Sequence, residues 1–380
     1  MKQVITTVGT SIFSKYFDPE KNKNIDSCAK SAYKNTLKEK HFMPSDKWND
    51  NQIENAVKSI RNAIKPYIKN NNQASAEIKS LLKLKEVLKD ELEVYLLATD
   101  TVLSRLASEL IKESLNGDIT IHFNPDQDII KGLQVFDSDK FEREGLINLI
   151  NRISTICNGF YDNTILNITG GYKAAIPYLT MMGQVYLIPI YYIFEDTQEL
   201  IKIPQTPLDI NWEMFEKYKD LIYKLDSGIE DYNTQKNQRY HDYVLLEERG
   251  LVEYYDNIGL LSPIGKIFWE RYKSKYFIFF SSEDVWNKIQ RQDDIQRILK
   301  VKFCHPCLRD NKTEIKQDHY VYDDGNNDNR IYYFEENESI YIYKTFENEE
   351  KAKQYINNKI DKQQIMGEAS VRSIEKDPYA

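Results

Sequence analysis

The stretch NITGGYKAAIPYLT at residues 167–180 decides the fold class of the first half of the chain. It begins inside the buried-strand candidate 164–169 and passes through Gly170 and Gly171 into helical sequence. Two glycines after a strand let backbone N–H groups approach an anion, and a following helix points its positive end at the same place. Lys173 adds a full positive charge. The stretch predicts a strand–turn–helix unit that can hold a phosphate, although a tight turn with a solvated lysine explains these residues equally well.

Strands and helices alternate around this stretch. The β-branched or apolar runs that predict strands are 2–8, 94–98, 119–123, 164–169 and 189–194. Apolar residues at helical spacing predict helices over 53–68, 76–88, 102–114 and 140–157. This alternation over about 200 residues is typical of a parallel sheet covered by helices on both faces. We therefore expect an α/β fold here.

Three segments end these strands with small or hydrogen-bonding residues: 8–11, 98–101 and 167–173. An open parallel sheet binds ligands at the carboxyl ends of its strands, so the three segments form a candidate site. The candidate binding residues are Thr10, Ser11, Thr99, Asp100, Gly170, Gly171, Tyr172 and Lys173. Neither GxxxxGK[ST] nor GxGxxG after the first strand is present, which argues against a nucleoside-triphosphatase loop or a dinucleotide fingerprint. Taken alone, Ser11 is as readily a helix cap and Asp100 a turn residue.

Composition limits the protein's class. The chain has 380 residues, a net charge of −8, 41% hydrophobic and 12% aromatic residues, which predicts two or three folded domains. The apolar stretch 181–194 is too short to span a bilayer, and the N-terminus lacks the pattern of a signal peptide. The four cysteines do not form a disulfide framework, so we expect a cytoplasmic protein. Cys304 and Cys307 lack a second ligand pair for zinc, and we predict no metal and no cofactor.

The pattern changes after Pro204 and Pro207. Residues 211–273 are mostly helical, but two short strands flank a turn near 256–259, and Ser262-Pro263 caps a new helix. This order is typical of a winged helix-turn-helix. A third block begins with the strand 276–280, continues through a helix over 282–300 and a basic loop over 303–318, and ends with strands at 319–322, 330–334 and 339–345 and a helix near 348–357. Residues 361–380 show no clear period, which predicts a loose tail.

The first block resembles the CRISPR-associated Rossmann-fold sensor domains called CARF. The resemblance rests on Gly9-Thr10-Ser11, LLATDT at 96–101, IIKGLQVFD at 129–137 and above all NITGGYKAAIPYLT at 167–180. It implies a homodimer that binds cyclic oligoadenylate across its two-fold axis, with cyclic tetra-adenylate as allosteric activator. It also implies that Thr10 and Ser11 line one loop and Gly171, Tyr172 and Lys173 another. Some relatives cleave the ring slowly with a serine and a lysine at the positions of Ser11 and Lys173.

The third block resembles the RelE/HigB messenger-RNA interferases, through YFIFF at 276–280, DVWNKIQRQDDIQRILK at 284–300 and NRIYYFEENESIYIYKTF at 329–346. No arginine is followed five residues later by histidine, which excludes the HEPN nuclease that many such sensors carry. The whole chain therefore resembles CRISPR-associated CARF–RelE interferases. The resemblance implies a sensor over 1–205, a winged-helix connector over 206–274, a RelE-like α+β ribonuclease over 275–360 and a tail over 361–380.

Metal-independent RNA cleavage needs a base for the 2′-hydroxyl, cations for the phosphorane and an acid for the leaving oxygen. We expect Arg330 to clamp the transition state, His319 to act as general acid or base, and Lys344 or Lys316 to supply a second cation. The alternatives are a structural histidine, an arginine paired with a nearby aspartate and a solvated edge-strand lysine.

Charge limits how such a nuclease holds RNA. Residues 297–316 carry a local net charge of +4, but the block 275–360 has a net charge of −2. A small basic patch on an acidic body binds RNA weakly by itself. We therefore expect cleavage of messenger RNA in the ribosomal A site, with the ribosomal stalk protein a candidate docking partner by resemblance.

Two other functions stay open. The winged helix is slightly acidic, with a net charge of −1 over 239–273, so DNA binding as a ligand-gated transcription regulator is the less favoured reading. A ring nuclease with an inactive output domain is the other. No membrane partner is expected.

Overall fold

The computed structural model describes residues 1–38, 43–69, 71–115, 117, 119–134, 136–194, 199–325 and 327–377. Contacts within the chain divide it into two compact units. The first unit contains Met1–Asp209 and Ser262–Ile267, and the second contains Ile210–Leu261 and Phe268–Ala380. The fold is therefore multidomain α/β, and each unit is described by itself.

The first unit combines short strands with helices of up to 19 residues. In chain order its elements are β1 (Lys2–Val8), α1 (Ser11–Tyr16), α2 (Ser27–Ala32), η1 (Tyr33–Lys38), η2 (Ser45–Asn49), α3 (Asn51–Lys69), α4 (Ala76–Leu88), β2 (Leu92–Thr99), α5 (Val102–Leu115), β3 (Thr120–His122), α6 (Pro125–Asp128), β4 (Ile129–Ile130), α7 (Ser138–Lys140), η3 (Phe141–Leu146), α8 (Ile147–Cys157), β5 (Thr164–Asn167), η4 (Lys173–Ala175), α9 (Ile176–Tyr186), β6 (Ile190–Ile193) and β7 (Leu200–Ile203).

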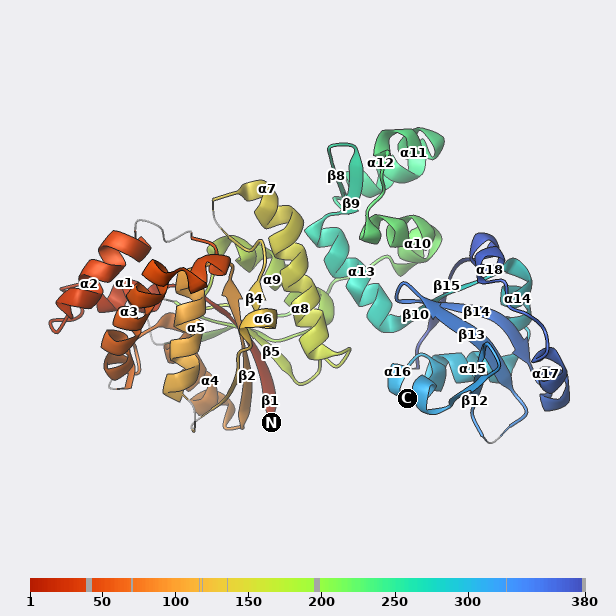
Figure 1. The fold of residues 1–380 in the computed structure, drawn as a ribbon, viewed down its shortest axis with the longest axis horizontal. Coiled ribbons are helices and arrows are strands. Elements are labelled where there is room, and N and C mark those ends of the chain that lie inside the picture. The colour runs from red at the N-terminus through yellow and green to blue at the C-terminus, as the bar shows by residue number, and fades with distance from the viewer. Residues whose placement is uncertain are drawn as a thin grey trace. The chain divides into compact units, whose positions relative to one another are not determined.

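A mostly parallel sheet forms the centre of this unit (Figure 1). Among the described residues its strand order is β3-β2-β1-β5-β6-β7, with β4 paired to the end of β2. β1 is parallel to β2 on one side, where Val4 lies opposite Val94, and to β5 on the other, where Val4 lies opposite Ile165. The parallel core that the alternating pattern predicts is confirmed. The edge strand β7, which is antiparallel to β6, was not predicted.

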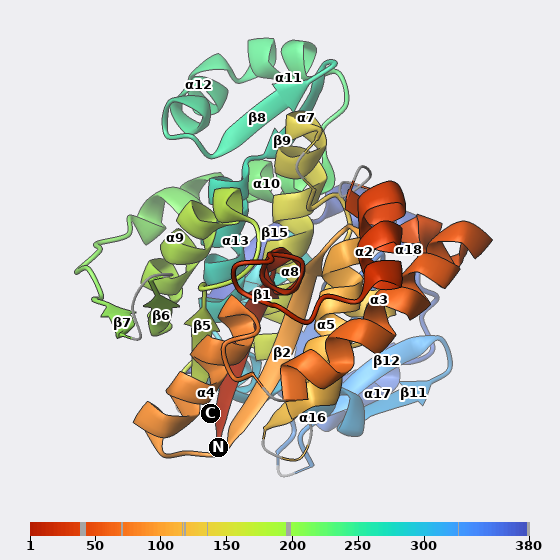
Figure 2. The ribbon, with the colours of Figure 1, turned by 90° about the vertical axis from the view of Figure 1, so that its left-hand side faces the viewer.

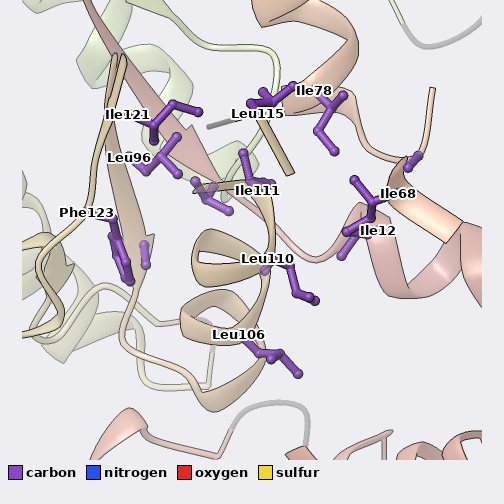
Figure 3. Packing of buried hydrophobic residues seen from close by; sticks show 14 of the residues in the cluster. Ile12, Ile68, Ile78, Leu96, Leu106, Leu110, Ile111, Leu115, Ile121 and Phe123 are labelled. Atoms are coloured by element: carbon purple, nitrogen blue, oxygen red, sulfur yellow. The ribbon is translucent and has the colours of Figure 1, made fainter. Parts of the chain in front are cut away.

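Helices cover both faces of the sheet (Figure 1; Figure 2). On one face α4 and α5 pack against β1 and β2, and α3 packs outside α5. α5 buries Leu106, Leu110 and Ile111; Leu110 is four residues after Leu106 and Ile111 follows it directly, so the three side chains lie toward one side of the helix. Figure 3 shows these side chains between Leu96 of β2 and Ile68 of α3.

The second unit holds two smaller sheets. Its elements are α10 (Trp212–Ser227), α11 (Tyr232–Gln238), α12 (Tyr240–Glu248), β8 (Val252–Tyr255), β9 (Ile258–Leu261), α13 (Pro263–Lys275, whose first residues belong to the first unit), β10 (Tyr276–Ser281), α14 (Glu283–Ile289), α15 (Asp293–Ile298), η5 (Leu299–Phe303), α16 (Pro306–Asn311), β11 (Thr313–Lys316), β12 (His319–Asp323), β13 (Arg330–Glu336), β14 (Ser339–Phe346), α17 (Glu349–Tyr355), α18 (Lys362–Glu368) and β15 (Ser370–Glu375).

The larger sheet has the order β11-β12-β13-β14-β10-β15, and β8 pairs with β9 in a separate hairpin. α10 joins the helical segment to this sheet. The Tyr223 ring packs edge-on against Phe280 with centroids 5.0 Å apart, and its hydroxyl lies 2.5 Å from Ser339 Oγ. Nearer the start of α10, Glu216 accepts a hydrogen bond from Ser373 of β15. These contacts explain why residues 210–261 cluster with the C-terminal sheet.

Two predictions for the C-terminal part are wrong. Residues 361–380 were expected to be a loose tail, but they form α18 and β15, and β15 pairs antiparallel with β10 along its whole length. The expected basic loop over 303–318 contains α16 and β11. β15 depends on pairing with the distant strand β10, and β11 on pairing with the neighbouring strand β12. The sequences of β11 and β15 themselves show little alternation of apolar and polar residues. Residues 378–380 of the expected tail lie outside the described residues.

In the part of the chain that the structure describes, no helix is both long enough and apolar enough to cross a membrane.

The position of β15 gives a test of the fold. Ile374 is 6% exposed and packs in the core between the larger sheet and α14. We expect Ile374→Ala to lower the free energy of unfolding by about 2–4 kcal/mol, because it leaves a cavity in a packed core. The measurement is urea denaturation followed by circular dichroism. Glu375→Ala, at the exposed neighbouring position, is the control and should leave the urea midpoint of unfolding unchanged. An unchanged urea midpoint for Ile374→Ala would contradict the packing of β15.

Candidate functional site

The first candidate site lies where the strand order of the parallel sheet reverses. The chain runs outward from β1 to β2 and β3 and then returns to the other side of β1 to place β5 and β6. Open α/β sheets bind ligands in the crevice outside such a switch point, at the carboxyl ends of the strands. By this rule the candidate site lies between the loop after β1, residues 9–11, and the loop after β5, residues 168–173. We call it the switch-point crevice.

The backbones of these two loops approach each other closely. A Cβ atom on Gly9 would lie 3.0 Å from the nitrogen of Gly171, and one on Gly171 would lie 2.6 Å from Cβ of Thr7. Gly171 also has a φ of +91°, which favours glycine. Thr7 Oγ1 donates a hydrogen bond of 2.7 Å to the carbonyl of Gly170. Packing against β1 is thus sufficient to require a glycine at position 171.

A carboxylate that the sequence analysis missed fills the space between the loops. Glu77 lies in the first turn of α4 and is 1% exposed. The backbone N–H of Gly9 donates to its Oε1 at 2.8 Å, and Ser11 Oγ donates to its Oε2 at 3.3 Å. Ser11 Oγ also accepts a hydrogen bond of 3.1 Å from the N–H of Ala76. A Cβ atom on Gly170 would lie 2.1 Å from Glu77 Oε1, so the glycine makes room for the carboxylate.

The predicted binding residues at this crevice are partly accessible. Thr10 and Lys173 are exposed, while Ser11, Gly170, Gly171 and Tyr172 are half-buried. The Tyr172 ring meets Phe141 edge-on with centroids 5.1 Å apart. The structure therefore brings six of the eight predicted binding residues to the two loops that border one crevice.

Thr99 and Asp100 have partners inside the fold. The N–H of Thr99 donates to Ser104 Oγ at 3.0 Å. Asp100 is 8% exposed and accepts from Ser45 Oγ at 2.7 Å and from the N–H of Gly132 at 3.1 Å, while Lys131 Nζ lies 3.3 Å away. Burial by itself would raise the pKa of Asp100, but these three partners outweigh it and hold the pKa below its usual range. Asp100 braces the segment 130–133.

The second candidate site is one face of the larger sheet in the second unit. We call it the α17 face, because α17 packs over its buried residues Val321, Tyr332, Phe334 and Tyr343. In antiparallel pairs, opposite residues point to the same side. Lys316 lies opposite His319, and Lys344 lies opposite Tyr332. The four predicted catalytic residues Lys316, His319, Arg330 and Lys344 therefore share the α17 face.

A β-bulge shapes this face. Tyr332 pairs with Lys344 but Tyr333 pairs with Ile342, so Tyr343 is an extra residue in β14. Tyr343 and Lys344 are consecutive, yet Tyr343 packs in the core of the α17 face, and the Lys344 ammonium lies 5.4 Å from the ring centre of Tyr355 on α17. The bulge thus turns two successive side chains to the same side.

His319 is held by three hydrogen-bond partners and is 1% exposed. Its Nε2 lies 3.1 Å from the carbonyl of Ile356 and 2.9 Å from that of Asn358. Carbonyls only accept, so Nε2 must carry the hydrogen, and in the neutral ring Nδ1 accepts the bond of 2.7 Å from the Tyr343 hydroxyl. Burial raises the pKa of Tyr343, which keeps that hydroxyl protonated. In this arrangement His319 fastens the segment after α17 to the sheet.

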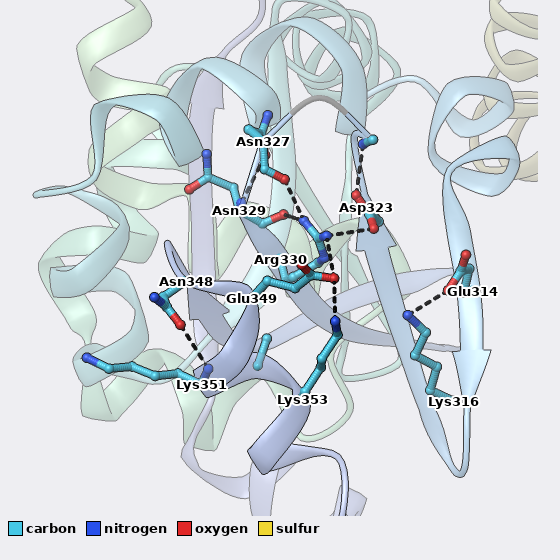
Figure 4. Close-up of polar contacts among 12 residues, drawn as sticks. Glu314, Lys316, Asp323, Asn327, Asn329, Arg330, Asn348, Glu349, Lys351 and Lys353 are labelled. Atoms are coloured by element: carbon cyan, nitrogen blue, oxygen red, sulfur yellow. Dashed lines mark hydrogen bonds and ion pairs between the residues drawn. The ribbon is translucent and has the colours of Figure 1, made fainter.

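Arg330 is similarly surrounded (Figure 4). It is 6% exposed, and its guanidinium contacts Asp323 at 2.8 Å and Glu349 of α17 at 3.4 Å. It also donates to the carbonyls of Asn327 and Asn329 at 2.8 and 2.9 Å. Two carboxylates and two carbonyls thus occupy the guanidinium in this conformation.

The two lysines differ. Lys316 pairs with Glu314 at 2.6 Å along the edge strand β11. Lys344 is half-buried, and burial together with the nearby Lys288 ammonium lowers its pKa. Within the described ranges, no three or more His, Cys, Asp or Glu side chains are grouped to hold a metal ion. Cys304 is buried and Cys307 exposed, and both are free thiols.

A protein family described as CRISPR-associated protein (Cas_APE2256) matches residues 72–206. The match is to a family of CRISPR-associated proteins and is confined to these residues. It includes Glu77, Asp100 and the loop 168–173, and it ends before the second unit. No curated protein matches the chain.

The partners of Asp100 give a test of its role. We expect Asp100→Asn to lower the free energy of unfolding at pH 7 by about 1–3 kcal/mol, because buried donors lose an ionised acceptor. A carboxylate with a lowered pKa stabilises the fold fully above its unfolded pKa of about 3.9 and loses this effect as pH falls through the folded pKa. The difference from the unaltered chain should therefore shrink in urea titrations below about pH 4. Asp162→Asn, at an exposed position, is the matched control.

Unchanged stability of Asp100→Asn would contradict this structural role, and weaker ligand binding by the same variant would support the predicted role of Asp100 in binding.

Proposed function

We propose that the first unit senses cyclic oligoadenylate, with cyclic tetra-adenylate as activator, and that the second unit is a ribonuclease that cuts messenger RNA on the ribosome. The protein would then be an auxiliary effector of type III CRISPR antiviral defence, acting as a cytoplasmic homodimer. The observation that carries this proposal is that residues 72–206, which match a CRISPR-associated family, contain the glycine loop 168–173 at the topological switch point of a parallel sheet.

The chemistry of the crevice supports an anionic ligand. Lys173 supplies an exposed ammonium, and the N–H of Gly9 and the hydroxyl of Ser11 already hold a carboxylate. Such donors bind phosphodiester oxygens equally well. A ring of four adenylates has evenly spaced phosphates, so a two-fold dimer would meet it with two identical sets of donors.

The lysine of the glycine loop tests the sensor. We expect Lys173→Glu to weaken binding of cyclic tetra-adenylate by at least about 100-fold, because it replaces attraction of a phosphate by repulsion. Isothermal titration calorimetry measures the effect. Lys89→Glu makes the same charge change just before β2, at the amino ends of the strands and away from the candidate site. This variant should bind cyclic tetra-adenylate normally. Micromolar binding retained by Lys173→Glu would contradict the site.

The α17 face supports the ribonuclease proposal through the residue types it collects. Lys316, His319, Arg330 and Lys344 occupy one face, and cations with a histidine are sufficient for 2′-hydroxyl attack without a metal. Lys344 is the best-placed of them, because it is half-buried, and burial and the Lys288 ammonium outweigh the nearby Asp284 carboxylate and lower its pKa, which suits proton transfer. Cleavage by Arg330 and His319 would require α17 and the segment after it to move.

Lys344 tests the nuclease. We expect Lys344→Ala to lower activator-dependent cleavage by about 100-fold or more, which is the usual effect of removing a proton-transfer group or charge clamp. The assay is cell-free translation with and without cyclic tetra-adenylate, with cut sites read by primer extension. Lys351→Ala, at an exposed position on α17, is the control. Equal cleavage by the Lys344 and Lys351 variants would move the proposal to another cation.

A second function is favoured by the filled contacts of His319 and Arg330. If His319 and Arg330 keep these contacts when RNA is present, the second unit is inactive. The protein is then a sensor that cleaves its own activator with Ser11 and Lys173. In that case the same translation reactions would show no cut message, and chromatography of the nucleotide would show linear products.

A further inference from the structure

The buried carboxylate of Glu77 is unusual in its partners. It is 1% exposed, and its described side-chain contacts are hydrogen bonds from Gly9 and Ser11, with no lysine or arginine among them. Carboxylates so deeply buried are normally paired with a cation, because desolvation of the charge costs several kcal/mol. Two hydrogen bonds and the N-terminus of α4 offset part of this cost.

The position of the carboxylate coincides with the switch-point crevice. Oε1 takes the N–H of Gly9 at the end of β1, and Oε2 takes the hydroxyl of Ser11 in the same loop. On the other side, Oε1 fills the space that a side chain at position 170 would need. The groups that would hold a phosphate oxygen are therefore already satisfied by an anion of the chain itself.

We propose that Glu77 is an internal anion that competes with the ligand phosphate for the Gly9 N–H and the Ser11 hydroxyl and thereby sets the affinity of the crevice. This inference rests on the proposed function of the first unit. The ligand binds only when the carboxylate withdraws, so the measured dissociation constant is the intrinsic one divided by the fraction of molecules in which the crevice is open. Charge repulsion between Glu77 and the incoming phosphate raises it further.

Glu77→Gln tests the competition. The amide keeps the size of the side chain and still accepts a hydrogen bond from Gly9, but it carries no charge. We expect the dissociation constant for cyclic tetra-adenylate to fall by at least about tenfold in calorimetric titrations. Glu86→Gln, which makes the same charge change at an exposed position of the same helix, should leave it unchanged. Unchanged or weaker binding by Glu77→Gln would overturn the proposal.

A second variant keeps the test valid if Glu77→Gln does not fold. Glu77→Asp retains the charge but is shorter by one methylene group, so its oxygens draw back from Gly9. It should bind the activator more tightly than the unaltered chain, and equal or weaker binding would again overturn the competition.

The same titrations separate the two proposals. Binding by the unaltered chain without tightening in the Glu77 variants overturns only the role of Glu77. Absence of binding in the unaltered chain and in every folded variant overturns the sensor, and with it the competition. Binding that is measurable only in the Glu77 variants supports both.

Discussion

The parallel pairing of β1 with both β2 and β5 is the constraint on which the first unit depends. It places the loops after β1 and β5 at the same end of the sheet, where the strands have their carboxyl ends. The backbones of the two loops are in contact there at Gly9 and Gly171. At that distance a side chain at position 171 would collide with Thr7, and one at position 170 would collide with Glu77. The glycines, the buried carboxylate and the crevice are consequences of one strand arrangement.

In the second unit the comparable constraint is the β-bulge at Tyr343. A regular strand would place Tyr343 and Lys344 on opposite faces, and the face under α17 would lose one of them. With the bulge, Tyr343 reaches His319 while Lys344 approaches Tyr355. His319 then binds the carbonyls that follow α17, so the helix is fastened to the sheet by the residue that the sequence suggested as a catalyst.

Local periodicity explains how much of this could be predicted from the sequence. The strand 2–8 and the helix 76–88 appear with the predicted bounds, because their apolar spacing is a local signal. β15 could not be found in this way, because its strand conformation depends on pairing with β10, almost one hundred residues earlier.

The residues of the candidate sites also differ in whether a local sequence signal or a distant partner determines their place. The glycine loop is visible in the sequence because Gly-Gly-Tyr-Lys follows a strand. Asp100 is predicted from the sequence to belong to that site, and the fold adds a hydrogen bond from Ser45, fifty-five residues away, that the sequence does not reveal. Glu77 looks like an ordinary acidic residue in the first turn of a helix, and only the fold shows that its carboxylate reaches the loop after β1. Both residues have partners that are distant in sequence, and these partners cannot be found from local pattern alone.

Both candidate sites are filled by groups of the chain itself. In the crevice the donors hold Glu77, and on the α17 face Arg330 and His319 hold Glu349 and the backbone after α17. Buried polar groups need partners, and here groups of the chain itself supply them. Under the proposed function, a ligand or substrate would exchange these partners rather than fill an empty space, and its net gain would be the difference between two sets of hydrogen bonds. Because a ligand can shift an equilibrium between two states only by the difference in its affinity for them, the internal partners limit how strongly a ligand could act at either site.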